Sequence, residues 1–211
     1  MLWDSKGNRR IPSLPAFDRA VSRLPHGELE RLCEFNPWGP VYLIPTRPFL
    51  RALARAIRDA GARRVLEVAA GDGHLARSLA AAAPDLDVTA TDSGAWERPQ
   101  ARMNPQERRK LRGVKGLALG AGVVRMDALA AIARFRPQLV LASWLLPGPL
   151  LKRIARAAPL LLEIGAGSGV TGGVRAWPHT FLDDVAALAR CRLDEHPRQK
   201  LHTRVILYSP R

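Results

Sequence analysis

The stretch Arg64-Val-Leu-Glu-Val-Ala-Ala-Gly-Asp-Gly-His-Leu-Ala-Arg77 decides the fold. It opens with a short apolar run, 65–68, that carries one acid, Glu67. Gly71 and Gly73 follow, and then a segment rich in leucine and alanine. This order predicts a buried strand that turns sharply into a helix. Such a turn exposes backbone N–H groups, and its glycines let a ligand approach the main chain closely.

Downstream of this stretch, short apolar runs alternate with helical patterns, which predicts a mostly parallel α/β sheet with right-handed crossovers and helices on both faces. The last two predicted strands are joined by about eight residues, too few for a crossover helix, so we expect them to pair antiparallel. The expected strands are 65–68, 86–91, 123–126, 138–143, 160–164, 190–194 and 203–208, and the expected helices are 74–83, 128–135, 149–157 and 180–189.

Residues 1–60 are expected to form a short N-terminal helical cap packed on the core, and residues 61–211 the ligand-binding domain. The cap ends in a predicted helix, 47–60, which Thr46 caps and Gly61 terminates. At 211 residues and 47% hydrophobic content, the chain is long enough for one such domain.

Composition also bears on location. The first ten residues show no secretory signal, and the longest apolar run is too short for a membrane span, which favours a cytoplasmic protein. Cys33 and Cys191 match no metal or redox spacing, so no metal site is predicted.

The chain is strongly basic, with a net charge of +14, which would attract a polyanion such as RNA. Most of the basic residues are arginines spread along the chain, as a compositional bias would place them. The densest basic run, 98–115, contains no aromatic residue, whereas nucleic-acid sites combine basic and aromatic side chains. A solvated segment is therefore favoured over an RNA-binding patch.

Acidic residues stand at or near the ends of the first three predicted strands: Glu67, Asp92 and Asp127. The carboxyl ends of parallel strands share one edge of the sheet, where ligands bind in open α/β folds. A carboxylate at Asp92 can accept both hydroxyls of a ribose. Asp127, with the backbone of Ala128, can read an adenine edge, or it can serve only as a helix N-cap. The ordered trio, together with the glycine turn, predicts a nucleoside-binding site.

The pattern Glu-x-x-x-Gly-x-Gly, followed by the acids at 92 and 127, resembles the motifs of class I S-adenosylmethionine-dependent methyltransferases. The resemblance implies a Rossmann-like seven-stranded sheet with a C-terminal antiparallel hairpin and S-adenosylmethionine as the cofactor. Ala69 stands where that family usually has a glycine. Trp38-Gly39, and a tryptophan ending the fourth strand, also resemble a group of small, mostly uncharacterised methyltransferase-like proteins. The implied cofactor-binding residues are Glu67, Ala69, Gly71, Asp72, Gly73, Asp92, Ser93, Asp127, Ala128 and Ser143.

Two other interpretations compete with this one. The run 71–76 also satisfies G-x-G-x-x-A, a nicotinamide-cofactor pattern, but about sixty residues precede it and Glu67 suits an ammonium better than a pyrophosphate. The stretch Leu162-Glu-Ile-Gly-Ala-Gly-Ser-Gly169 matches the methyltransferase glycine motif even better than the first one. Too few residues follow it for a nucleotide-binding fold, so we interpret 165–173 as a loop, either beside the active site or on the surface.

Methyl transfer from a sulfonium needs positioning and desolvation more than a general base. Candidate bases are His74 and His179, and Ser143 and Trp144 are expected nearest the methyl group. The expected acceptor is a small molecule, with an RNA or ribosomal-component methyltransferase and a non-catalytic binding protein as alternatives; the oligomeric state stays open. Residues that could wall the acceptor are Trp38, Tyr42, Trp144 and Trp177.

Overall fold

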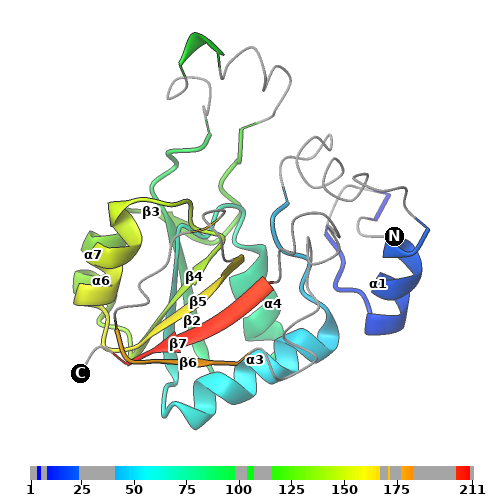
Figure 1. The fold of residues 1–211 in the computed structure, drawn as a ribbon, viewed down its shortest axis with the longest axis horizontal. Coiled ribbons are helices and arrows are strands. Elements are labelled where there is room, and N and C mark those ends of the chain that lie inside the picture. The colour runs from blue at the N-terminus through cyan, green and yellow to red at the C-terminus, as the bar shows by residue number, and fades with distance from the viewer. Residues whose placement is uncertain are drawn as a thin grey trace.

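The computed structural model describes residues 4–5, 9–23, 41–97, 104–106, 116–166, 171, 177–182 and 203–209. Its centre is a seven-stranded sheet in the order β3-β2-β1-β4-β5-β7-β6 (Figure 1). The first five strands are parallel, and β7 runs antiparallel between β5 and β6. This confirms the predicted Rossmann-like sheet with its antiparallel end. The strands are β1 Arg64–Val68, β2 Asp87–Asp92, β3 Val123–Arg125, β4 Leu139–Ser143, β5 Leu161–Ala166, β6 His179–Phe181 and β7 Thr203–Tyr208.

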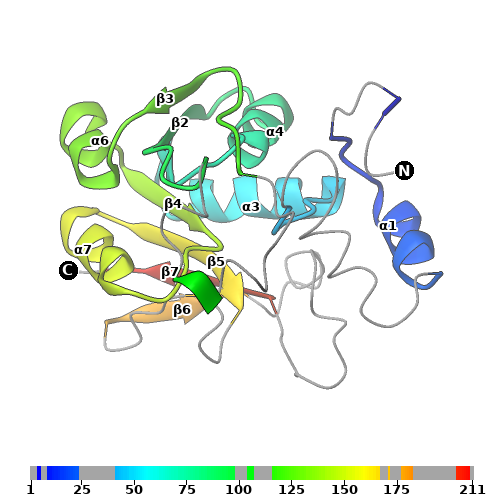
Figure 2. The same ribbon diagram turned by 90° about the horizontal axis from the view of Figure 1, so that it is seen from above.

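Helices cover both faces of the sheet (Figure 2). On one face, α3 (Arg47–Asp59) and α4 (His74–Ala82) pack on alternate strand residues such as Val65 and Leu141. On the other, α6 (Ala128–Phe135) and α7 (Pro149–Ala157) pack on the intervening residues, such as Leu66. Because each of these strands is apolar on both sides, the sheet is buried between two helical layers. A further helix, α1 (Leu14–Val21), lies to one side of these layers (Figure 1).

The predicted start of α3 is confirmed in detail. Thr46 has an extended backbone, and its side chain accepts a hydrogen bond from the Phe49 amide, while Pro48 lies in the first turn. Phe49, Leu53 and Ile57 are fully buried, so α3 is part of the core beneath the sheet. The proposed division at residue 60 therefore falls between a core helix and the strand that follows it.

The predicted helix 180–189 is wrong at its start, because Thr180 and Phe181 belong to β6 and pair with β7. A β-branched and an aromatic residue beside an unpaired strand edge favour the extended backbone. The predicted loop 165–173 is also wrong at its start, since β5 continues through Gly165, which pairs with Arg204. The predicted hairpin strand 190–194 lies outside the described residues, as do Trp38, Cys33, Cys191 and most of the basic run 98–115.

Within the described residues, no helix has the length and apolar character needed to cross a membrane.

Candidate functional site

The chain leaves β1 through a turn with an unusual backbone. Ala69, Gly71 and Gly73 have φ angles of 52°, 57° and 68°, so every second residue is left-handed. Two amides of the turn are fixed by main-chain bonds, from Ala70 to the Thr91 carbonyl (3.0 Å) and from Gly73 to the Ala70 carbonyl (2.9 Å). Left-handed backbone is cheap for glycine but strained for alanine. The turn therefore needs its glycines, and Ala69 holds the glycine-like conformation in spite of its side chain.

Glu67 lies beneath this turn. Its side chain points to the α4 face of the sheet, and the residue is 2% exposed. One carboxyl oxygen, Oε2, accepts a hydrogen bond from the Ala76 amide in the first turn of α4, at 2.9 Å. Burial raises the pKa of Glu67 to about 8, although the Ala76 amide opposes the shift. Glu67 is therefore mostly neutral at pH 7 and is ready to ionise when a cation comes close.

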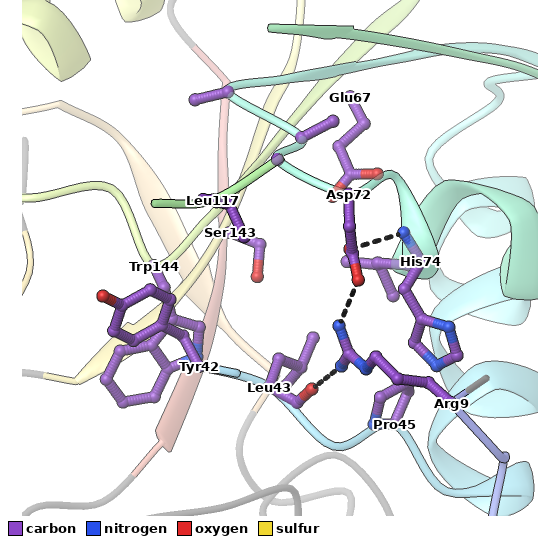
Figure 3. A pocket seen from close by; sticks show the side chains of 14 residues that line it. Arg9, Tyr42, Leu43, Pro45, Glu67, Asp72, His74, Leu117, Ser143 and Trp144 are labelled. Atoms are coloured by element: carbon purple, nitrogen blue, oxygen red, sulfur yellow. Dashed lines mark hydrogen bonds and ion pairs between the residues drawn. The ribbon is translucent and has the colours of Figure 1, made fainter. Parts of the chain in front are cut away.

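A cavity opens beside the turn, at the carboxyl ends of β1 and β4 (Figure 3). It encloses about 480 Å³ of empty space, part of which is open to solvent. Polar groups line one side, and aromatic and apolar groups line the rest. The lining residues are Arg9, Tyr42, Leu43, Pro45, Glu67, Ala69, Ala70, Gly71, Asp72, His74, Leu75, Leu117, Ser143 and Trp144.

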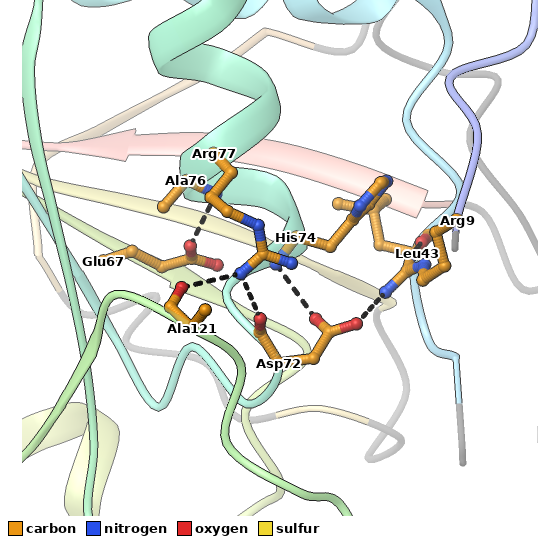
Figure 4. A network of polar contacts seen from close by, with 8 residues as sticks. All are labelled: Arg9, Leu43, Glu67, Asp72, His74, Ala76, Arg77 and Ala121. Atoms are coloured by element: carbon orange, nitrogen blue, oxygen red, sulfur yellow. Dashed lines mark hydrogen bonds and ion pairs between the residues drawn. The ribbon is translucent and has the colours of Figure 1, made fainter. Parts of the chain in front are cut away.

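A polar network borders the cavity at the start of α4 (Figure 4). The Asp72 carboxylate accepts from the His74 amide at 3.0 Å and pairs with the Arg9 guanidinium, also at 3.0 Å. Burial alone would raise the pKa of Asp72, but Arg9 and the His74 amide together hold it below its usual range. Arg77 ties the turn to the chain before β3, because its guanidinium donates to the carbonyls of Asp72 and Ala121.

His74 is buried in this network, with 7% of its surface exposed. Its Nε2 atom has no hydrogen-bond partner among the described residues. Burial and the neighbouring Arg9 lower the pKa of His74 to about 4, so the ring is neutral at pH 7. A base with such a low pKa accepts protons weakly, so the lowered pKa favours a binding role over the predicted general-base role.

The end of β4 supplies the opposite wall. Ser143 and Trp144 line the cavity, as does Tyr42, whose side chain is exposed. Trp144 has a φ of 54°, a strained conformation for a bulky residue, and its amide donates to the Ile164 carbonyl at 2.7 Å. Strained backbone at a strand end beside a cavity is typical of functional sites.

The predicted ribose-binding residue, Asp92, lies next to the turn but does not line the cavity. Its two carboxylate oxygens accept from the Gly71 amide (2.9 Å) and the Gly94 amide (2.7 Å), and the residue is almost fully buried. Each oxygen keeps a second lone pair for a sugar hydroxyl. A ligand reaches these lone pairs only if a neighbouring segment moves. Leu117 packs on the turn, because a Cβ on Gly71 would lie 2.5 Å from its Cδ2 atom.

The predicted adenine-side residues also lie outside the cavity lining. Asp127 is exposed and caps α6, accepting from the amides of Leu129 (2.9 Å) and Ala130 (3.3 Å). Ala128 is buried in the core of the second face. Ser93 is exposed just after β2, and Gly73 packs on Val123. Their roles in binding a nucleoside stay predictions.

His179 and Trp177 were placed wrongly by the sequence. His179 pairs with Tyr208, which in turn pairs with Leu161 at the amino end of β5, so it lies at the sheet edge opposite the cavity. Its ring contacts Phe181 and Tyr208, and Trp177 packs on the second-face core. The error arises from the missed strand β6, which carries this segment away from the cavity.

The sequence missed Arg9, Leu43, Pro45 and Leu117 as lining residues. Arg9 precedes every predicted element and belongs to no motif, and Leu117 comes after the basic run in a segment without periodicity. Only the tertiary fold brings them to the glycine turn.

Comparisons with known proteins found similar solved structures but no matching family model or curated protein. Similar solved structures include the methyltransferase domain of bacterial CtHen1 (11% identity, 77% of this chain and 98% of that chain, TM-score 0.46). Another is human methyltransferase 10 domain containing protein (11% identity, 86% of this chain and 92% of that chain, TM-score 0.45). A third is the plantazolicin methyltransferase BpumL (10% identity, 78% of this chain and 85% of that chain, TM-score 0.40).

The sheet order, with an antiparallel β7 inserted between β5 and β6, defines the class: the chain has a class I S-adenosylmethionine-dependent methyltransferase-like fold.

Proposed function

We propose that this chain is an S-adenosylmethionine-dependent methyltransferase that acts on a small-molecule acceptor. One observation carries the proposal: the buried acid Glu67 lies under a left-handed glycine turn that opens into a cavity. A buried carboxyl beside a turn that opens into a cavity suits a ligand with a cationic amino group. The nicotinamide alternative gains no support from Glu67, because a pyrophosphate offers no cation with which this carboxyl could pair.

The residues present fit the cofactor at its amino-acid end. Glu67, once ionised, would pair with the ammonium group, and the backbone of the turn, 69–73, would lie along the methionine chain. Asp92 would hold the sugar through its remaining lone pairs. Asp127 and Ala128 stay the proposed adenine-side residues.

When bound, S-adenosylmethionine supplies a methyl group on a positively charged sulfur, which is already activated for displacement. The chain then has to orient the acceptor and exclude water. Ser143 and Trp144, at the end of β4, and Tyr42, on the facing segment, line the space in which an acceptor would lie. The aromatic side chains of Tyr42 and Trp144 in the cavity wall favour a small, partly apolar acceptor over a nucleic-acid strand.

Binding is tested by calorimetric titration with S-adenosylhomocysteine and, separately, with NAD⁺. We expect binding of the first and none of the second. Asp92→Asn should weaken S-adenosylhomocysteine binding about tenfold or more, since it removes one charged acceptor from the site. Asp87→Asn is the matched control, because Asp87 is exposed at the other end of the same strand. Binding of NAD⁺ alone would overturn the proposal.

Catalysis is tested by incubating the protein with methyl-labelled cofactor and cell extract separated into small-molecule and RNA fractions. Label in the small-molecule fraction is the expected result. Label in RNA alone would replace the proposed acceptor with the RNA alternative. Cofactor binding without label in either fraction would favour the non-catalytic alternative.

A further inference from the structure

The N-terminal segment reaches the cavity from outside the sheet. Pro12 accepts a hydrogen bond from the Arg47 amide at 3.1 Å, and Ile11 packs against the core, so the segment is held beside the start of α3. From there Arg9 extends its side chain to the glycine turn (Figure 3). Its guanidinium donates to Asp72 at 3.0 Å and to the Leu43 carbonyl at 2.5 Å.

These two bonds fix the guanidinium but do not use all of it. An arginine side chain has five N–H donors. Within the described residues, two of them make the bonds to Asp72 and Leu43. The side chain is 18% exposed and lines the cavity, so its remaining donors are partly desolvated and lie beside the ligand space. A desolvated guanidinium with free donors binds a carboxylate or phosphate strongly.

His74 gives a second, independent sign at the same place. It contacts Asp72 through its amide, as Arg9 does through its guanidinium, and it is one of the residues that line the cavity. The buried Nε2 atom has no partner among the described residues, and an unsatisfied buried polar atom is unfavourable. A neutral imidazole protonated on Nε2 would donate to an anionic oxygen.

We infer that Arg9 and His74 form a subsite for the α-carboxylate of the ligand, while Glu67 takes the ammonium group. The inference rests on the proposed function and names residues for one end of the same ligand. Asp72 neutralises part of the Arg9 charge and orients the guanidinium, which favours a single carboxylate over a multiply charged phosphate. The subsite joins the N-terminal segment to the first residue of α4, so the segment before α1 becomes part of the binding site.

The test compares two ligands that differ only in this group: S-adenosylhomocysteine and its decarboxylated analogue. Affinities are measured by calorimetry for the wild type, Arg9→Met, Arg9→Lys and the control Arg10→Met, whose side chain is exposed on the next residue. Arg9→Met should weaken S-adenosylhomocysteine binding about 10- to 100-fold, as loss of a charged hydrogen bond would, and leave the analogue unchanged. Arg9→Lys keeps the charge, so its affinity for S-adenosylhomocysteine should lie between those of the wild type and Arg9→Met. Arg10→Met should bind both ligands as the wild type does.

His74→Leu is the second variant, and it should weaken the binding of S-adenosylhomocysteine more than the binding of the decarboxylated analogue. If Arg9→Met weakens both ligands equally, or neither, Arg9 only supports the structure and the inference is overturned. Wild-type protein that binds neither ligand would instead overturn the proposed function itself. Thermal unfolding of each variant confirms that it is folded.

Discussion

Two stretches of the sheet share one pattern: a glutamate buried in an apolar strand, followed by glycines. In β1 the acid is Glu67, and in β5 it is Glu163. Glu67 accepts from the main chain of the next helix, whereas Glu163 accepts from the Tyr208 hydroxyl of the neighbouring strand at 2.8 Å. The first acid lines a cavity, and within the described residues the second acts as a partner for another strand.

The backbones after the two acids differ as well. After Glu67 the chain alternates left-handed residues and enters α4. After Glu163, Gly165 stays in the sheet and pairs with Arg204, and its missing side chain leaves room for Thr171. Glycine serves as a turn residue in one place and as a packing residue in the other. Its use depends on the neighbouring element, which is a helix in the first stretch and a pairing strand in the second.

The largest expected difference between the stretches is in ligand affinity. Glu67→Gln should weaken S-adenosylhomocysteine binding at pH 8 about 30- to 150-fold, because a charge-assisted hydrogen bond contributes roughly 2–3 kcal/mol. Glu163→Gln is the matched control, because it changes the same residue type at an equally buried strand position. It should leave ligand affinity within about twofold, since Glu163 bonds Tyr208 and is not among the residues that line the cavity. Equal losses in calorimetry would mean that the second stretch also belongs to the site.

The next effect is a pH dependence of stability. The folded-state pKa of Glu67, about 8, lies above its unfolded value of 4.5, so the folded chain holds an extra proton between them. This contribution is complete below pH 4.5 and is lost as the pH rises through 8. Between pH 6.5 and 8 the unfolding free energy should fall by roughly 1–2 kcal/mol, given about 1.4 kcal/mol per pH unit at most.

The window starts at pH 6.5, the ordinary pKa of histidine, because His74, with its lowered pKa of about 4, contributes an opposite trend mainly below that pH. Urea unfolding at several pH values measures the slope. Glu67→Gln should remove it, and Glu163→Gln should keep it. A slope that survives in Glu67→Gln would show that another group titrates.

A smaller effect is expected from the second stretch alone. Tyr208→Phe removes the hydroxyl bound to Glu163 in a fully buried position and should lower the unfolding free energy by about 1–2 kcal/mol, with ligand affinity unchanged. Tyr42→Phe, at an exposed position lining the cavity, is the control and should change stability by less than about 0.5 kcal/mol. A change of affinity in Tyr208→Phe would contradict the separation of the two stretches.

Most of the fold was predictable because its signals are local. The limits of α6 and α7 were predicted to the residue, since each has an N-terminal signal, Asp127 for α6 and Pro149 for α7, and carries one apolar face. The strand β6 was not predicted, because Thr180 and Phe181 suit either a helix or a strand. Pairing with β7 determines that this segment is a strand. Short segments at a sheet edge depend on a partner distant in the sequence.

The site was predictable only where the motif is continuous. Glu67, Gly71 and Asp72 line the cavity, as do Ser143 and Trp144 at the end of a correctly predicted strand. Arg9 and Leu117 come from segments without periodicity, so nothing in the sequence ties them to the turn. The predicted position of His179 was wrong because it depends on the strand β6, which the sequence pattern did not indicate.

The smallest expected effect concerns Ala69, the residue of the β1 stretch that stands where the methyltransferase motif usually has a glycine. Ala69 has a φ of 52°, a conformation that costs an alanine roughly 1–2 kcal/mol. Ala69→Gly removes this strain but adds flexibility to the unfolded chain, which offsets about 0.4–1 kcal/mol. We expect a net stabilisation of roughly 0.5 kcal/mol in urea unfolding. Arg136→Gly, at another left-handed position far from the turn in sequence, is the control and should behave alike. If Ala69→Gly lowers the unfolding free energy and Arg136→Gly does not, the methyl group of Ala69 makes stabilising contacts in the turn. The alanine would then stabilise this chain more than the glycine of the motif would.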